Sequence, residues 1–223
     1  FTMSNLEIEL QALKENLLEM MGLVSKQVSL CKEATFSGNL ALAEDVIVNE
    51  KRINNLELTI DKDCENILAL HNPVATDLRF VLAVLKITND LERIGDNAKN
   101  IAVFLTKSGK KLDKAYLDKF SIEKMYEASI AMLSCLGKAL KDDDAELARK
   151  TFKDDEILNK KNKSGPKTAA ALIEADPKQA KLIVRLLAVV NKLERIGDLA
   201  INIAEEVVFH VEAKVLKHNK DKS

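Results

Sequence analysis

The hexapeptide Leu-Glu-Arg-Ile-Gly-Asp fills residues 91–96 and returns unchanged at residues 193–198, 102 positions later. The agreement extends beyond the hexapeptide, because Asn89 and Asn100 are matched by Asn191 and Asn202 at the same offset. Six consecutive identities are not expected by chance in a chain of 223 residues. The two halves of the chain are therefore predicted to be tandem copies of one structural unit.

Helical periodicity fills almost the whole sequence between a few short interruptions. Gly and Pro together number only ten, where an average chain of this length carries roughly 25, so tight β-turns are scarce. The interruptions predict six long helices over residues 4–37, 39–71, 73–107, 115–141, 144–174 and 177–216. Short loops make sequential helices antiparallel. The predicted fold is all-α, with two tandem, duplicated three-helix bundles in residues 1–110 and 111–223.

Proline marks three positions in this helical pattern. Asn72 and Asp176 each precede a proline, and both are predicted to cap a helix whose first residue is that proline. Pro166 instead lies inside the fifth helix, directly after Gly165. Because an internal proline removes a backbone hydrogen bond and crowds the preceding turn, a kink or local break is expected near Gly165.

The repeated helix has an apolar side and a polar side. Its apolar residues follow steps of four and three, which is typical of a helix packed lengthwise in a bundle. At about 100° per residue, four oxygen-bearing side chains gather roughly opposite that seam, on a stripe expected to be exposed. The stripe consists of Asn89, Glu92, Asp96 and Asn100 in the first copy and of Asn191, Glu194, Asp198 and Asn202 in the second.

This polar stripe has two interpretations. It is either a solvated surface, partly neutralised by Arg93 and Arg195, or a cation site. Each copy carries two like charges one turn apart with a glycine between them, and both features lower helix stability. A surface that only faces solvent has no need to repeat this combination. Carboxylate and amide oxygens suit Mg, Mn or Fe better than Zn, which prefers Cys and His. The preceding helix of each copy offers further ligands, namely Glu50 and Asn54 in the first and Asp155 and Asn159 in the second, with Glu57, Asp154 and Glu156 also within reach.

Composition and motifs exclude several classes of protein. The formal net charge of −1 argues against a nucleic-acid binder. No apolar run approaches the roughly 20 residues that span a bilayer, so direct membrane insertion is not expected. Three widely spaced cysteines, with no Cys-x-x-Cys, indicate a reducing, cytosolic compartment. No nucleophile–base pair or phosphate-binding loop is recognisable, which favours a non-catalytic adaptor. A metal-dependent phosphohydrolase and a metal-free tethering bundle remain as alternatives.

The duplicated motif resembles the signature of the PhoU family of bacterial phosphate-signalling regulators. Residues 73–79, Pro-Val-Ala-Thr-Asp-Leu-Arg, are similar to the start of the family's third helix. The resemblance covers nearly the whole chain and implies two three-helix bundles. It implies Glu/Asp-x-x-x-Asp motifs that hold surface metal clusters in some members, here Glu92 with Asp96 and Glu194 with Asp198, with the ion (Fe, Mn, Mg or Zn) left open.

The resemblance also implies a function. Members are cytoplasmic negative regulators of the phosphate-starvation response that link the ATPase subunit of the phosphate ABC transporter to a sensor histidine kinase, and many form homodimers. The second copy departs from the pattern, because Gln179-Ala180-Lys181 replaces Asp-Leu-Arg and Lys192 stands where the first copy has Asp90. We therefore expect the second metal site to be the weaker one.

Overall fold

The structure is a computed structural model and describes residues 4–109 and 111–213. Seven α-helices and one short 3-10 helix, with no strand among the described residues, confirm the all-α prediction. The helices are α1 (Asn5–Ser37), α2 (Leu40–His71), α3 (Ala75–Ser108), α4 (Lys114–Lys119), α5 (Ile122–Asp142), α6 (Ala145–Ala175), η1 (Pro177–Gln179) and α7 (Ala180–Glu212). None of the helices in the described part of the chain combines the length and the apolar character that crossing a membrane requires.

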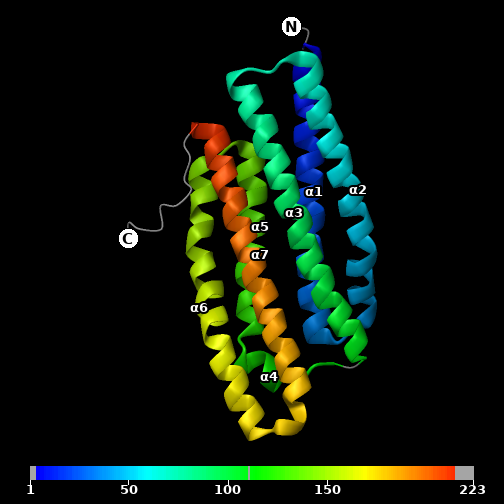
Figure 1. The fold of residues 1–223 in the computed structure, drawn as a ribbon, viewed down its shortest axis with the longest axis vertical. Coiled ribbons are helices and arrows are strands. Elements are labelled where there is room, and N and C mark those ends of the chain that lie inside the picture. The colour runs from blue at the N-terminus through cyan, green and yellow to red at the C-terminus, as the bar shows by residue number, and fades with distance from the viewer. Residues whose placement is uncertain (1–3, 110, 214–223) are drawn as a thin grey trace.

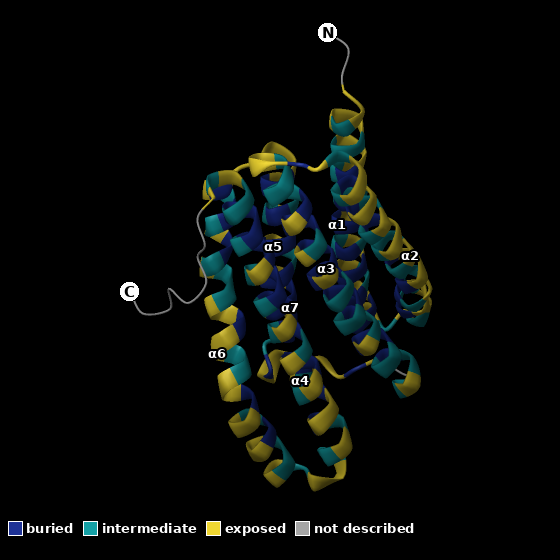
Figure 2. Cartoon of the chain, turned by 45° about the horizontal axis from the view of Figure 1, so that its top comes forward, coloured by how far each residue is buried: buried dark blue, intermediate teal, exposed yellow. Residues whose placement is uncertain are grey.

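Two three-helix bundles lie side by side with their long axes roughly parallel (Figure 1). Helices α1, α2 and α3 form the first, and α5, α6 and α7 form the second. Helix α3 packs along α7, and α1 packs along α5, so one continuous hydrophobic core runs through both bundles. The buried residues lie on the inward faces of the helices (Figure 2). This common core fixes the repeats against each other and creates a long seam between α3 and α7.

The ends of the helices follow from capping side chains and from residues that adopt a left-handed backbone conformation. Ser4 forms a capping box with Glu7, and Gly38 ends α1 at a φ of 76°. Asp176 accepts a hydrogen bond from the Lys178 backbone N–H ahead of η1, as predicted. The predicted N-cap at Asn72 is wrong, because Asn72 ends α2 with a φ of 45° and α3 begins after Val74. Asn tolerates this left-handed conformation better than most residues, so it ends a helix as readily as it starts one.

Two predicted helices differ in the structure. The single helix predicted over residues 115–141 is wrong, because Ser121 takes a φ of 55° and separates α4 from α5. This turn lets Phe120 and Ile122 both be buried, whereas one continuous helix would point them to different sides. Of the kink or local break predicted near Gly165, the break is wrong, because α6 continues through Pro166. Gly165 is buried against α7 while Pro166 is exposed, so packing holds the helix together there. The predicted end of the last helix at residue 216 lies outside the described residues.

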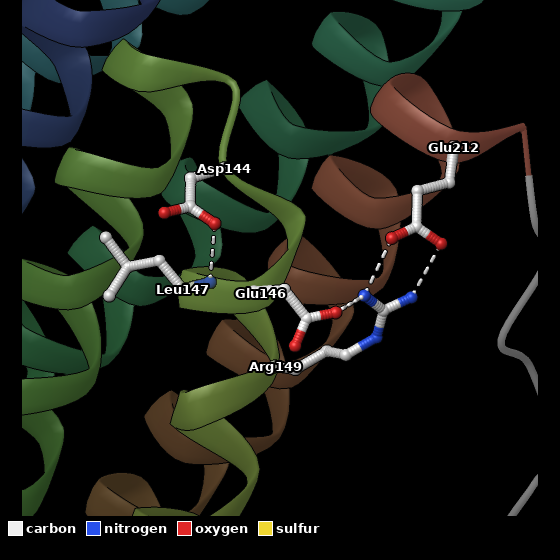
Figure 3. Close-up of polar contacts among 5 residues, drawn as sticks. All are labelled: Asp144, Glu146, Leu147, Arg149 and Glu212. Carbon is white, nitrogen blue, oxygen red and sulfur yellow. Dashed lines mark hydrogen bonds and ion pairs between the residues drawn. The ribbon is translucent and has the colours of Figure 1, made fainter.

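A charged clamp joins the start of α6 to the end of α7 (Figure 3). Asp144 caps α6 by accepting a hydrogen bond from the Leu147 backbone N–H at 2.9 Å. One turn further on, both terminal nitrogens of Arg149 donate hydrogen bonds of 2.8 Å to the two carboxylate oxygens of Glu212. Arg149 Nη1 also donates to Glu146 Oε1 at 2.6 Å. Bidentate pairs of this kind are stronger than single hydrogen bonds between neutral groups, so the clamp fixes the end of α7.

Candidate metal site between helices α2 and α3

The strongest candidate site lies where α2 packs along α3. Glu92 and Asp96 stand one turn apart on α3, and Glu50 reaches them from α2. Each of the three residues offers one carboxylate oxygen such that all three oxygens lie within 4.8 Å of one another. Glu50 is only 2% exposed, and Glu92 and Asp96 are half-buried. The expectation of an exposed stripe is therefore wrong at this point, because α2 covers the side of α3 that carries the carboxylates.

Gly95 allows the two helices to approach this closely. A Cβ atom at Gly95 would lie 3.3 Å from Ile53 Cδ1 of α2 and 3.3 Å from the side-chain oxygen of Gln27 on α1. Both contacts are tighter than most packed Cβ contacts, so a larger residue would push α2 or Gln27 away. The glycine in the middle of the repeated motif thus serves helix packing, and that packing brings Glu50 to Glu92 and Asp96.

Burial and mutual repulsion make these carboxylates reluctant to ionise. Burial raises the pKa of Glu50, and the nearby Asp96 and Glu92 raise it further, while Lys99 opposes this shift. The pKa of Glu92 is raised by burial and then by Asp96. Burial also raises the pKa of Glu57, which lies two turns after Glu50 on α2, with Glu92 as the next cause. We call Glu50, Glu57, Glu92 and Asp96 the acidic cluster.

The cluster lacks enough positive charge and enough hydrogen-bond donors of its own. Lys99 Nζ lies 3.2 Å from Asp96 Oδ1 but 3.7 Å from Glu50 Oε2, beyond hydrogen-bonding distance. The amide of Asn54, oriented to donate, reaches Glu50 Oε1 at 2.9 Å. Glu50 Oε2 is buried and has no hydrogen-bond partner. Among the described residues, Lys99 is therefore the one cation that pairs with the carboxylates of Glu50 and Asp96, and one buried oxygen of Glu50 has no hydrogen-bond donor. Because a buried carboxylate needs both kinds of compensation, a cation held by Glu50, Glu92 and Asp96 fits this site.

The same position in the second repeat is built differently. Asp155 replaces Glu50 at an offset of 105, and its Oδ2 accepts a hydrogen bond of 2.6 Å from Asn159. Asn162 replaces Glu57. Burial and then Asp198 raise the pKa of Glu194, and a hydrogen bond with Asn162 partly offsets this rise. Among the described residues, only the first repeat assembles three or more acidic, His or Cys side chains this closely. The structure therefore brings Glu50 to the predicted pair in repeat 1 and pairs the acids of repeat 2 with amides.

Comparison with known proteins identifies the family. The family model described as the PhoU domain matches residues 17–105 and again residues 122–207. The chain belongs to the PhoU family. The two matches cover most of the chain, and each falls on one of the repeats.

Individual PhoU proteins are similar over nearly the full length of the chain. A phosphate-specific transport system accessory protein PhoU homolog from a Burkholderia species is 31% identical over 218 residues, which cover 96% of this chain and 92% of that protein. The corresponding homolog 1 of Thermotoga maritima is 29% identical over 95% of this chain and 90% of its own length. The crystal structure of PhoU from Pseudomonas aeruginosa superposes with a TM-score of 0.85 at 30% identity, covering 93% of this chain and 99% of that one.

Not every residue of the predicted PhoU stripe lies at the candidate site. Asn100 and Lys192 line a groove between α3 and α7. Asn202 hydrogen-bonds Asp90 across the same seam. The charges that shift the pKa of Glu194 are those of Asp198 and Arg195, and Lys192 is not among them.

Two residues of the site escaped the sequence analysis. Lys99 lies one turn after Asp96, where its ammonium group could have been expected to reach the carboxylate. Asn162 is the counterpart of Glu57 at the offset of 105 that relates Glu50 to Asp155. Applying the same offset two turns after Glu50 would have shown that the second repeat has an amide where the first has an acid.

Proposed function

We propose that this chain is a non-catalytic accessory protein of phosphate uptake that represses the response to phosphate starvation. Its relatives named as phosphate-specific transport system accessory proteins support the transport role. By the same resemblance, it acts in the cytoplasm as a homodimer and connects the ATPase subunit of a phosphate ABC transporter to a sensor histidine kinase.

The observation that carries the proposal of a metal-dependent regulator is the buried Glu50 Oε2, which has no hydrogen-bond partner and belongs to a carboxylate facing Glu92 and Asp96. A hard divalent or trivalent cation supplies the positive charge that this trio lacks, with Glu57 and Asn54 as neighbouring donors of oxygen. Because the ligands come from both helices, bound metal ties α2 to α3. The Glu194–Asp198 pair, with Asp155 and Asn159, forms the weaker second site.

Partner binding tests the regulatory role most simply. We expect the purified chain to bind the ATPase subunit of a phosphate transporter and the cytoplasmic part of the sensor kinase, and to restore repression of a phosphate-starvation reporter in a bacterium that lacks its own PhoU protein. The variant Glu92→Gln/Asp96→Asn should repress less than Glu44→Gln, which changes an exposed acid on α2 outside the cluster. A chain that binds neither partner and leaves the reporter active contradicts the proposal.

The same preparation distinguishes a regulator from an enzyme. We expect no release of phosphate from a generic phosphate ester with added Mg, Mn, Fe or Zn. Metal-stimulated turnover that disappears in the Glu92→Gln/Asp96→Asn variant would instead establish a phosphohydrolase.

A further inference from the structure

Two grooves of opposite charge lie along the seam between α3 and α7. Lys107, Arg185 and Lys192 line the first, together with Phe104 and Asn100, and no acidic side chain lines it. We call this the basic groove. The second is lined by Asp90, Glu205, Glu206, Lys86 and Asn202, and we call it the acidic groove.

The duplication relates the two grooves position by position. At the offset of 102, Asn100 of the basic groove corresponds to Asn202 of the acidic groove, and Lys192 corresponds to Asp90. Likewise, the apolar positions Val103 and Phe104 of the basic groove are occupied by Glu205 and Glu206 in the acidic groove. The two copies thus keep the same helical framework for a groove while their side chains carry opposite charges.

Neither groove neutralises its own charge. Within the described part of the chain, Lys107, Arg185 and Lys192 take part in no ion pair, and the Arg185 guanidinium lies 5.9 Å from the centre of the Phe104 ring. In the acidic groove, Lys86 pairs with Glu206 at 3.1 Å, and Asp90 pairs with Arg93 at 3.4 Å. Glu205 forms no ion pair with another described residue, so this groove keeps an excess of negative charge.

Both grooves open on the same side of the molecule. Lys86 and Phe104 are 18 residues apart on α3, and Ala188 and Glu206 are 18 residues apart on α7. Eighteen residues make five helical turns, so each pair lies on one face of its helix, with the grooves about 27 Å apart. Helices α3 and α7 run side by side in opposite directions, in front of α1 and α5 (Figure 1).

This face also exposes apolar side chains at equivalent places. Leu82, one turn before Lys86, is 40% exposed, and its counterpart Val184, one turn before Ala188, is 55% exposed. Each lies beside one of the grooves. An exposed apolar side chain repeated at both ends of a face that also carries unneutralised charge is typical of a contact surface.

We propose that the face formed by α3 and α7 binds a second copy of this chain, with the basic groove of each copy against the acidic groove of the other. A twofold axis that lies in the plane of the interface, perpendicular to the seam, turns one face onto the other and exchanges its two ends. Opposite charges then meet at both ends, which is the self-complementary arrangement of a twofold dimer. A different protein would need both signs of charge at the same spacing. The inference rests on the homodimer in the proposed function and specifies its interface.

Charge reversal tests the interface. Sedimentation equilibrium of the full chain should show that Arg185→Glu and Glu205→Arg each raise the dimer dissociation constant by about tenfold or more, since like charges then oppose each other at both ends. The double variant Arg185→Glu/Glu205→Arg should recover most of the affinity. Lys124→Glu, an exposed change on α5 outside this face, is the control and should leave dimerisation unchanged.

The outcomes separate this interface from the dimer itself. Dimerisation of the wild type that weakens with salt, falls in both single variants and returns in the double variant supports the proposal. A wild type that dimerises with the same constant as every variant refutes this face and leaves the dimer of the proposed function standing. A wild type that stays monomeric at all accessible concentrations refutes both this interface and the dimer of the proposed function.

Discussion

The variant Glu50→Gln should be more stable against unfolding than the wild type without metal, and less stable than the wild type when metal is present. Glutamine keeps the shape of the side chain but removes the charge that burial, Asp96 and Glu92 disfavour. Its amide can also donate a hydrogen bond to the neighbouring Asp96. Relieving a buried polar group that lacks a partner is worth about 1 to 3 kcal/mol. For a chain of this size, each kcal/mol moves the melting temperature by about 2 to 4 °C.

Bound metal should reverse this order of stability. A cation present at 1,000 times its dissociation constant stabilises the wild type by about 4.1 kcal/mol, which exceeds the roughly 1 to 3 kcal/mol gained by the variant. The variant gains less from metal because it has lost one of three carboxylate ligands. Differential scanning calorimetry of chelator-treated protein, before and after addition of Mn or Mg, measures both effects. The control is Glu44→Gln, an exposed change on the same helix that should behave as the wild type does.

Two results would refute this reasoning. If Glu50→Gln is less stable than the wild type without metal, the buried carboxylate is already compensated by Asn54 and Lys99. If metal raises the melting temperature of both proteins equally, Glu50 is no ligand. The crossover is therefore a stronger test than either measurement alone.

Three further predictions concern pH, packing and the clamp. The folded protein raises the pKa of Glu50, Glu57 and Glu92 in the acidic cluster, so their protonation favours folding. Burial lowers the pKa of His210, which acts in the opposite direction over the same window. In urea denaturation of metal-free protein, the stability of the wild type relative to Glu50→Gln should therefore rise as the pH falls from 7 towards 5, and a relative fall contradicts this prediction. Gly197→Ala should lower the free energy of unfolding in urea by about 1 to 3 kcal/mol, because its Cβ would lie 2.4 Å from Leu158 Cδ1. The control Gly22→Ala, on an open surface of α1, should raise it by about 0.5 to 1 kcal/mol. Similar values for the two variants would show that α6 and α7 can separate freely. Arg149→Lys should lower the unfolding free energy by about 1 kcal/mol through loss of its bidentate bond to Glu212, and no change would show that the clamp is solvated.

The sequence predicted the fold because its signals were local or repeated. The duplicated hexapeptide indicated the tandem copies, and the short interruptions in the helical periodicity marked most helix ends within a few residues. The errors came from tertiary packing. Pro166 is tolerated because Gly165 lets α6 lie against α7, and the turn at Ser121 exists because Phe120 and Ile122 both reach the core. No periodicity in a single helix reveals such contacts.

The candidate site was predictable only in part. The repeated motif drew attention to Glu92 and Asp96, and the matching acid on the preceding helix pointed to Glu50. Helical projection placed the stripe opposite the core seam but could not show that α2 covers it. The same limit applies to the seam between α3 and α7, since the opposite charges of its two grooves become visible only when both helices are placed side by side.

We propose that the first repeat of this PhoU chain holds a cation more tightly than the second. Elemental analysis of protein purified without chelator or affinity metal, comparing Glu92→Gln with Glu194→Gln, tests it most directly. We predict that Glu92→Gln loses the larger share of bound metal, because among the described residues only the first repeat brings three carboxylate oxygens within 4.8 Å of one another. An equal or larger loss from Glu194→Gln, or a wild type that retains no ion after incubation with each metal, would contradict the claim.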